Sequence, residues 1–159
     1  MIVTLTPEEV RVCTMLGTER WLTKFGSIDK PNYAQGKADG KLEHELLANV
    51  RANVCEWAVA KHYNLSWNTP WYPNNFHPYR KRISDVSHNG EVRSVRTQTS
   101  IPLWEKDKDT IIFGTKCLDT EFFSQVQVYG YCSANDYMKP EYWDNYINGW
   151  RIPVELFML

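Results

Sequence analysis

The segment RISDVSHNGEVRSVRT, residues 82–97, predicts a β-hairpin. Its centre is Asn89-Gly90, the strongest short signal for a tight turn between two antiparallel strands. The residues on either side predict strands at about 82–87 and 91–97. We therefore expect the chain to reverse direction here, with the charged residues of both strands near one another.

Three charged residues flank this turn: Asp85 precedes it, and Glu91 and Arg93 follow it. Because side chains alternate along a strand, Glu91 and Arg93 project to the same face. A short hairpin brings the carboxylates of Asp85 and Glu91 close enough to share a divalent cation beside a phosphate. Three solvated charges at a turn are the simpler interpretation, and the residues alone leave both open.

The length and composition of the chain are those of an ordinary globular domain. A chain of 159 residues buries about two-thirds of its unfolded surface, and 43% of these residues are hydrophobic. No apolar run approaches the roughly 20 residues that cross a bilayer, and the N-terminus lacks the basic-then-apolar order of a secretory signal. We expect one domain, residues 1–159, in the cytoplasm and without a membrane partner.

Charge is distributed unevenly along the chain, although the net charge is only −1. Residues 80–96 hold five basic and two acidic residues, whereas residues 105–155 hold five basic and nine acidic residues. The basic segment coincides with the predicted hairpin, and a local basic patch is where a nucleic acid would bind. The residues that we expect to contact nucleic acid are Arg80, Lys81, Arg82 and Arg96.

The segment SWNTPWYPNNFHPYRKR, residues 66–82, leads into this basic region. Its alternating aromatic and basic residues could contact bases and phosphates. Its prolines and asparagines are more typical of a packed irregular loop.

The four cysteines, Cys13, Cys55, Cys117 and Cys132, are widely spaced and include no C-x-x-C pair. The four histidines show no ligand spacing relative to them. This pattern favours buried free thiols over a structural zinc site.

Two helices are expected before the hairpin, in an N-terminal part of about residues 7–63. The first starts with Thr6 as N-cap, Pro7 at the first helical position and Glu9 three residues after the cap. Gly26 can end it, and a loop follows. The second helix runs from about Lys41 to Tyr63.

Further strands are expected after the hairpin, where TIIFGT and FFSQVQVYGYC are rich in β-branched and aromatic residues. They extend the hairpin and sheet core to about residues 80–132. The C-terminal segment, residues 133–159, starts with a short helical or turn-rich piece and ends in an extended apolar one. This order predicts an α+β fold with a small mixed or antiparallel sheet flanked by helices.

Several pieces of the chain resemble the PD-(D/E)XK nuclease superfamily, which has the restriction-endonuclease-like fold. The narrower resemblance is to a group of small phage and prophage proteins with a D…EVRxxR motif. The pieces that carry it recur in order over nearly the whole chain: LTPEEVRVC, CEWAVAKHYNLSWN, DV followed by EVRSVR, VQVYGYC, KPEYW and IPVELF. The resemblance implies one restriction-endonuclease-like domain, whose core is a small mixed sheet flanked by helices.

The resemblance also implies roles for individual residues. Glu56 corresponds to the helix glutamate, Asp85 to the metal-binding aspartate, Glu91 to the first residue of the ExK element, and Arg93 to its lysine. Asp85 and Glu91 would be the ligands of Mg²⁺ or Mn²⁺. Arg93 departs from the family pattern, which has a lysine at this position. An arginine keeps the positive charge, but it is bulkier and stays protonated, so it is a poor substitute for that lysine.

Two main functions therefore remain open, beside a third in which the protein has a structural role, such as that of a virion component. The first is a metal-dependent DNA endonuclease of phage or prophage origin, with catalytic Glu56, Asp85, Glu91 and Arg93, which would act in the cytoplasm of the host cell. The second is a catalytically inactive protein of the same fold that binds nucleic acid or a host protein. A homodimer is compatible with either function.

Overall fold

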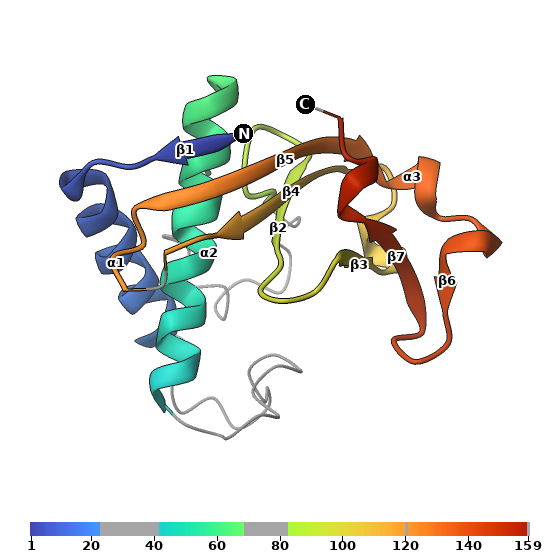
Figure 1. Cartoon of the computed structure of the whole chain (residues 1–159), viewed down its shortest axis with the longest axis horizontal. Helices are drawn as coiled ribbons and strands as arrows, with labels where there is room; N and C mark the ends of the chain where they lie inside the picture. The colour runs from blue at the N-terminus through green and yellow to red at the C-terminus, as the bar shows by residue number, and fades with distance from the viewer. Residues whose placement is uncertain (23–41, 69–82, 120, 159) are drawn as a thin grey trace.

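The computed structural model describes residues 1–22, 42–68, 83–119 and 121–158. It is an α+β fold, as predicted, with two long helices, a four-stranded mixed sheet and a three-stranded antiparallel sheet. The two helices lie side by side next to the four-stranded sheet, and the three-stranded sheet lies at the other side of the molecule (Figure 1).

Helix α1, Pro7–Leu22, begins with the predicted capping box. The backbone N–H of Glu9 donates to Oγ1 of Thr6 at 3.3 Å, and the backbone N–H of Thr6 donates to Oε2 of Glu9 at 2.7 Å. Because Pro7 has no N–H, three N–H groups at this helix start lack a helical partner, and neighbouring side chains satisfy two of them. The predicted end at Gly26 lies outside the described residues.

Helix α2, Leu42–Tyr63, has nearly the predicted bounds and packs on both α1 and the sheet. The helices approach so closely at Gly17 that a β-carbon there would lie 2.8 Å from Cα of Val50. The amide of Asn53 donates to the carbonyl of Cys13 at 3.3 Å across the same contact. Burial on two sides makes α2 the central element of the fold.

The four-stranded sheet has the order β1-β5-β4-β2, in which β2 runs parallel to β4 and the other neighbours are antiparallel. The predicted strands at TIIFGT and FFSQVQVYGYC are confirmed as β4 and β5. Strand β1 was not predicted, because three residues are too short to carry a periodic signal, and it forms by pairing with β5. The bounds are β1 Ile2–Thr4, β2 Gly90–Ser94, β4 Ile111–Cys117 and β5 Gln125–Ser133.

The three-stranded sheet has the order β3-β7-β6 and takes two of its strands from the C-terminal segment. Its strands are β3 Ser100–Leu103, β6 Trp143–Asp144 and β7 Gly149–Pro153. The turn-rich piece before it holds the short helix α3, Ala134–Tyr137, and a 3-10 turn at Pro140–Tyr142. Two further 3-10 turns are at Glu105–Asp107 and Val154–Leu156. The C-terminal piece that was expected to be extended is therefore strand β7 followed by a 3-10 turn.

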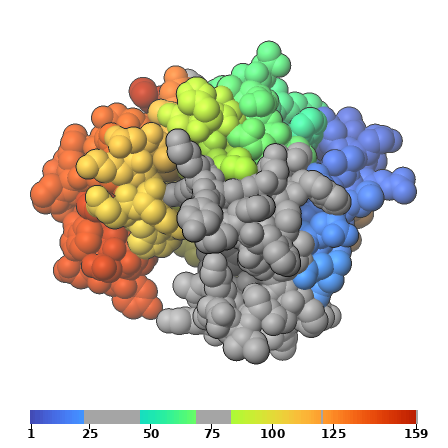
Figure 2. All heavy atoms as spheres, turned by 180° about the vertical axis from the view of Figure 1, so that it is seen from behind, coloured from blue at the N-terminus to red at the C-terminus, as the bar shows by residue number. Residues whose placement is uncertain are grey.

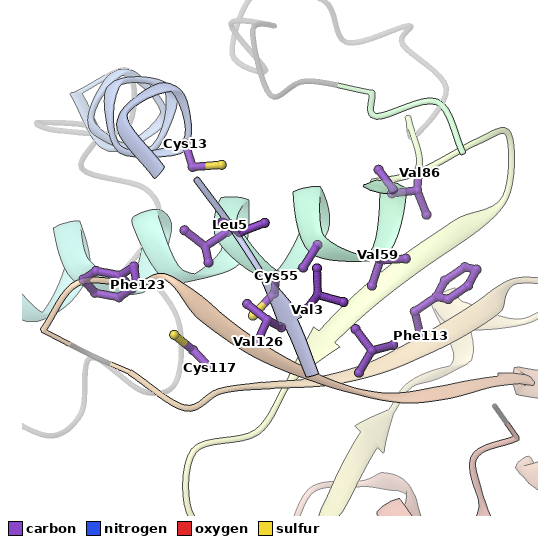
Figure 3. Packing of buried hydrophobic residues seen from close by; sticks show 14 of the residues in the cluster. Val3, Leu5, Cys13, Cys55, Val59, Val86, Phe113, Cys117, Phe123 and Val126 are labelled. Atoms are coloured by element: carbon purple, nitrogen blue, oxygen red, sulfur yellow. The ribbon is translucent and has the colours of Figure 1, made fainter. Parts of the chain in front are cut away.

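Two hydrophobic clusters lie on the opposite faces of the four-stranded sheet. The first fills the space between the sheet and the helices, where Cys55 and Val59 of α2 face Cys117 and Val126 of the sheet (Figure 3). The second joins the four-stranded sheet to the three-stranded sheet. Its fully buried members include Ile101, Leu103, Ile112 and Ile152.

A β-bulge in the pair β4–β5 changes which residues face each cluster. Gly114 pairs with Gly130, but Thr115 pairs with Val128, so β5 holds one extra residue. Val128 therefore belongs to the first cluster and Cys132 to the second, although a regular strand would place both on one face.

The predicted hairpin is only partly correct. Its second strand exists as β2, but residues 83–85 are not in a strand, and Val86 makes isolated bridges to Trp67 and Gly90. A tight turn, residues 86–90, takes the place of a long hairpin, with Ser87 at a φ of 54°. The backbone N–H of Val92 donates to Oδ2 of Asp85 at 2.8 Å. In a longer hairpin, a backbone carbonyl of the first strand would accept this hydrogen bond.

All four cysteines are free and buried, as predicted. Burial raises the pKa of Cys13, Cys55 and Cys132 to about 12, so these thiols stay protonated and unreactive near neutral pH. In the described part of the chain, no helix combines the length and the apolar character needed to span a membrane.

Candidate functional site

Glu56 lies buried in the middle of α2, where both of its carboxylate oxygens are bonded. Oε1 accepts a hydrogen bond from Nη1 of Arg20 at 3.0 Å, and Oε2 accepts one from Nε1 of Trp67 at 3.1 Å. Nη1 of Arg20 also donates to the side chain of Asn53 at 3.4 Å. The helix glutamate is therefore held in one orientation by a cation from α1 and an indole from the segment that follows α2.

Asp85 stands just before the turn at residues 86–90 and is partly buried. Burial, followed by the nearby charge of Glu56, raises the pKa of Asp85 to about 6, although the Val92 N–H and the charges of Arg20 and Arg93 act in the opposite direction. Among the described residues, no Lys, Arg or His lies within ion-pair distance of Asp85. Asp85 is thus a carboxylate near a second carboxylate, and no described cation forms an ion pair with it.

Arg93 lies on β2 between two acidic residues. Its Nη2 is 2.7 Å from Oδ1 of Asp107 and 3.8 Å from Oε2 of Glu91. The contact with Glu91 confirms that both side chains project to the same face of β2. The other carboxylate oxygen of the fully buried Asp107 accepts the backbone N–H of Trp104 at 3.0 Å. Arg93 therefore joins β2 to the 3-10 turn at Glu105–Asp107.

The four candidate catalytic residues come from α2, the turn and β2, which pack against one another. Asp85 and Glu91 directly flank the bridged pair Val86 and Gly90, on the two arms of the turn. Electrostatic interactions link Asp85 to Glu56 and Arg93. Figure 2 shows the yellow-green chain around this turn between the green end of α2 and the yellow residues that follow β2. Asp85 is therefore near both Glu56 and Arg93, whereas Glu91 and Arg93 project to the face of β2 opposite to Val92, which packs with α2 in the first cluster.

Three residues of this region were not anticipated: Arg20, Trp67 and Asp107. The sequence interval from Arg20 to Glu56 is 36 residues and that from Arg93 to Asp107 is 14, so no local pattern marks these pairs. Asp107 belongs to the charged segment EKDKD, whose composition is typical of a solvated turn. In the structure, however, the side chain of Asp107 is fully buried.

Of the expected nucleic-acid contacts, Arg80, Lys81 and Arg82 lie outside the described residues. Arg96 is exposed just beyond β2, and its backbone N–H donates to Oε1 of Gln98 at 3.0 Å. Within the described part of the chain, the guanidinium of Arg96 donates no hydrogen bond.

The acidic side chains of the candidate site suit Mg²⁺ or Mn²⁺ better than zinc. The described residues contain no group of three or more His, Cys, Asp and Glu side chains that could hold a metal ion. A zinc site, which takes three or four such ligands, therefore does not fit this part of the chain. Mg²⁺ and Mn²⁺ suit hard oxygen ligands, and Mg²⁺ needs only one or two carboxylates, with water and phosphate completing its shell. The carboxylates of Asp85 and Glu91 are hard oxygen ligands of this kind.

No protein-family model matches the chain, and no curated protein or solved structure shows significant similarity to it.

Proposed function

We propose that this protein is a metal-dependent deoxyribonuclease of the PD-(D/E)XK type, encoded by a phage or prophage, which hydrolyses phosphodiester bonds in DNA. The four-stranded mixed sheet, with α2 packed on it, would be the core of a restriction-endonuclease-like fold. Asp85 and Glu91 would hold the metal ion, Glu56 would support them, and Arg93 would carry positive charge beside the substrate phosphate.

The observation that carries this proposal is the pair of carboxylates Glu56 and Asp85. Glu56 is compensated by Arg20, whereas Asp85 has no cation within ion-pair distance in the described chain, and its pKa is raised to about 6. A divalent cation would favour the ionised form of Asp85 in this place. A carboxylate with a perturbed pKa, near an arginine, is typical of catalytic sites.

Each side chain has a definite task in this proposal. A bound Mg²⁺ or Mn²⁺ would polarise the scissile phosphate and lower the pKa of a bound water. The Arg20–Glu56 ion pair and the Trp67 hydrogen bond keep the helix carboxylate in place. Arg93 holds Glu91 in position and offers a fixed positive charge near the phosphate.

A second candidate function follows from the contact between Arg93 and Asp107. Because Nη2 of Arg93 lies 2.7 Å from a fully buried carboxylate, this arginine already has a structural partner. An arginine used in this way does not replace the mobile point charge of a lysine. The second candidate is a protein of the same fold without nuclease activity, which binds nucleic acid or a host protein.

Cleavage by the purified full chain tests the first function. Supercoiled, linear and single-stranded DNA are incubated with Mg²⁺, with Mn²⁺ or with EDTA. Three proteins are compared: the wild type, the double variant Asp85→Asn with Glu91→Gln, and the control Asp136→Asn. Asp136 is exposed on α3, so its variant loses one carboxylate away from the site. We expect metal-dependent cutting by the wild type and the control but not by the double variant.

Two results would overturn the nuclease assignment. Equal cutting by the wild type and the double variant would show that these acids are not the site. No cutting by folded wild-type protein with either metal, and no shift of its melting temperature by the metal, would favour the binding function. The salt dependence of binding then separates its two forms, because affinity for nucleic acid falls steeply with salt and affinity for a mainly apolar protein interface does not.

A further inference from the structure

Arg51 and Arg96 differ from the other arginines around the candidate site. Arg20 and Arg93 pair with Glu56 and Asp107. Arg51, on α2, is half-buried; its Nε is shielded from solvent and has no hydrogen-bond partner. In the described chain, no carboxylate lies within ion-pair distance of Arg51 or Arg96.

The sheet register and the packing of α2 bring these two arginines together. Ser94 pairs with Thr115, and the Val95 N–H donates to the Thr115 carbonyl at 2.9 Å. Arg96 therefore follows directly after the last residue that bonds to β4, near the end of β4 that holds Cys117. Cys55, one helical turn after Arg51, faces Cys117 across the first hydrophobic cluster (Figure 3). Burial, followed by the positive charge of Arg96, lowers the pKa of Arg51, which is the effect of two cations near each other.

Two neighbouring guanidinium groups without a carboxylate are suited to an oxyanion. A half-buried cation beside a second cation is destabilised until an anion compensates both charges. The planar fork of arginine matches the oxygens of a phosphate and can bind them in pairs.

We propose that Arg51 and Arg96 form a binding site for one phosphate group of a DNA backbone. Arg96 is five residues beyond Glu91 along β2 and its continuation, a span of at most about 17 Å in an extended chain. That span corresponds to roughly five base-pair steps. The pair thus anchors the DNA on one side of the bond that is cut, and in this respect the inference rests on the proposed nuclease function.

Equilibrium binding in EDTA tests the anchor without requiring catalysis. A fluorescein-labelled duplex of 20 base pairs is titrated with the wild type, Arg96→Gln and Lys139→Gln, and fluorescence anisotropy is measured at several salt concentrations. Lys139 is an exposed cation beside the 3-10 turn at Pro140–Tyr142, so its variant removes one positive charge elsewhere. Arg96 is exposed, and its replacement should leave the fold intact.

We expect Arg96→Gln to weaken binding by roughly 3- to 10-fold and to reduce the slope of log K against log salt by about one. Lys139→Gln should bind as the wild type does. Arg51→Lys, which keeps the charge but not the fork, should weaken binding less than Arg51→Gln. Equal affinities of Arg96→Gln and Lys139→Gln would overturn the proposal, whether or not the Arg51 variants fold.

A second measurement separates a DNA phosphate from a free one. Melting temperatures are recorded with and without inorganic phosphate. If phosphate stabilises the wild type but not Arg96→Gln, while both bind DNA equally, the pair binds a small oxyanion and the DNA assignment is overturned.

Failure of this inference and failure of the nuclease function give different results. A protein that cuts DNA but whose affinity does not depend on Arg96 keeps the nuclease function and loses the anchor. A protein that binds through Arg96 in EDTA but never cuts keeps the phosphate site and loses the nuclease function.

Discussion

The guanidinium of Arg93 and the carboxylate of Asp107 lie 2.7 Å apart, although 14 positions separate them in the chain. Asp107 is fully buried, and its second oxygen accepts the Trp104 N–H. One ion pair therefore connects β2 of the first sheet to the 3-10 turn that follows β3 of the second. Arg93 is therefore a structural connection between the two sheets.

Asp107→Asn should destabilise the protein substantially. The substitution removes the charge that compensates Arg93 and weakens a buried hydrogen bond, so we expect a loss of roughly 2–4 kcal/mol in the free energy of unfolding. Urea unfolding at pH 7 measures it. The matched control is Asp144→Asn, which removes the carboxylate paired with Arg151 at an exposed hairpin and should cost much less. Equal losses in the two variants would contradict the structural role of Asp107.

The stability of the protein should depend on pH through Asp85. The pKa of Asp85 is about 6 in the folded chain, compared with an ordinary value of 3.8. Folding therefore favours the protonated form of this carboxyl group. The stability that this group contributes is complete below about pH 3.8 and is lost as the pH rises through 6. Asp85→Asn, which carries no charge, should therefore be more stable than the wild type above pH 6, by at most about 3 kcal/mol.

Urea unfolding of wild type and Asp85→Asn between pH 4 and 8 measures this difference, which should shrink toward the acid end. Asp136→Asn is the control and should follow the wild type at every pH. A difference between wild type and Asp85→Asn that stays constant over this range would contradict the raised pKa. Addition of Mg²⁺ should reduce the advantage of Asp85→Asn near neutral pH, because a cation stabilises the ionised carboxylate.

Gly17→Ala should destabilise the protein, although alanine is the better helix former by about 1 kcal/mol. The added β-carbon would lie 2.8 Å from Cα and 2.9 Å from the backbone nitrogen of Val50, so the helices must move apart. We expect a net loss of roughly 1–3 kcal/mol in urea unfolding. Val12→Ala at an exposed position of α1 should change stability by less than about 0.5 kcal/mol. A stabilising Gly17→Ala would show that this close approach is wrong.

Thr6→Ala should cost about 1 kcal/mol, because it removes the side-chain acceptor at the start of α1. Thermal or urea unfolding measures the loss. Thr18→Ala is the control. The hydroxyl of Thr18 donates to the backbone carbonyl of Thr14 within α1, so it caps no unpaired group at the start of the helix. The control should lose no more than about 0.5 kcal/mol. Equal effects at the two positions would count against a specific capping role of Thr6.

Local features of the fold could be predicted because neighbouring residues determine them. The start of α1 depends on Thr6 and Glu9, three positions apart, and α2 on an apolar pattern within one helix. The hairpin prediction was only partly correct, because the side chain of Asp85 takes the Val92 N–H that a partner strand would otherwise bond. The bulge at Gly114 and Gly130 likewise has no signal in either strand alone.

The sequence by itself determined the α+β class, the two helices, strands β4 and β5, and the buried thiols. Each of these depends on the periodicity, capping or apolar character of one short segment. Only the tertiary structure decided that Arg20 compensates Glu56, that Arg93 compensates Asp107, and that Arg51 and Arg96 lie near each other. The physical reason is that charges interact through space, and packing brings together residues that are far apart in the chain.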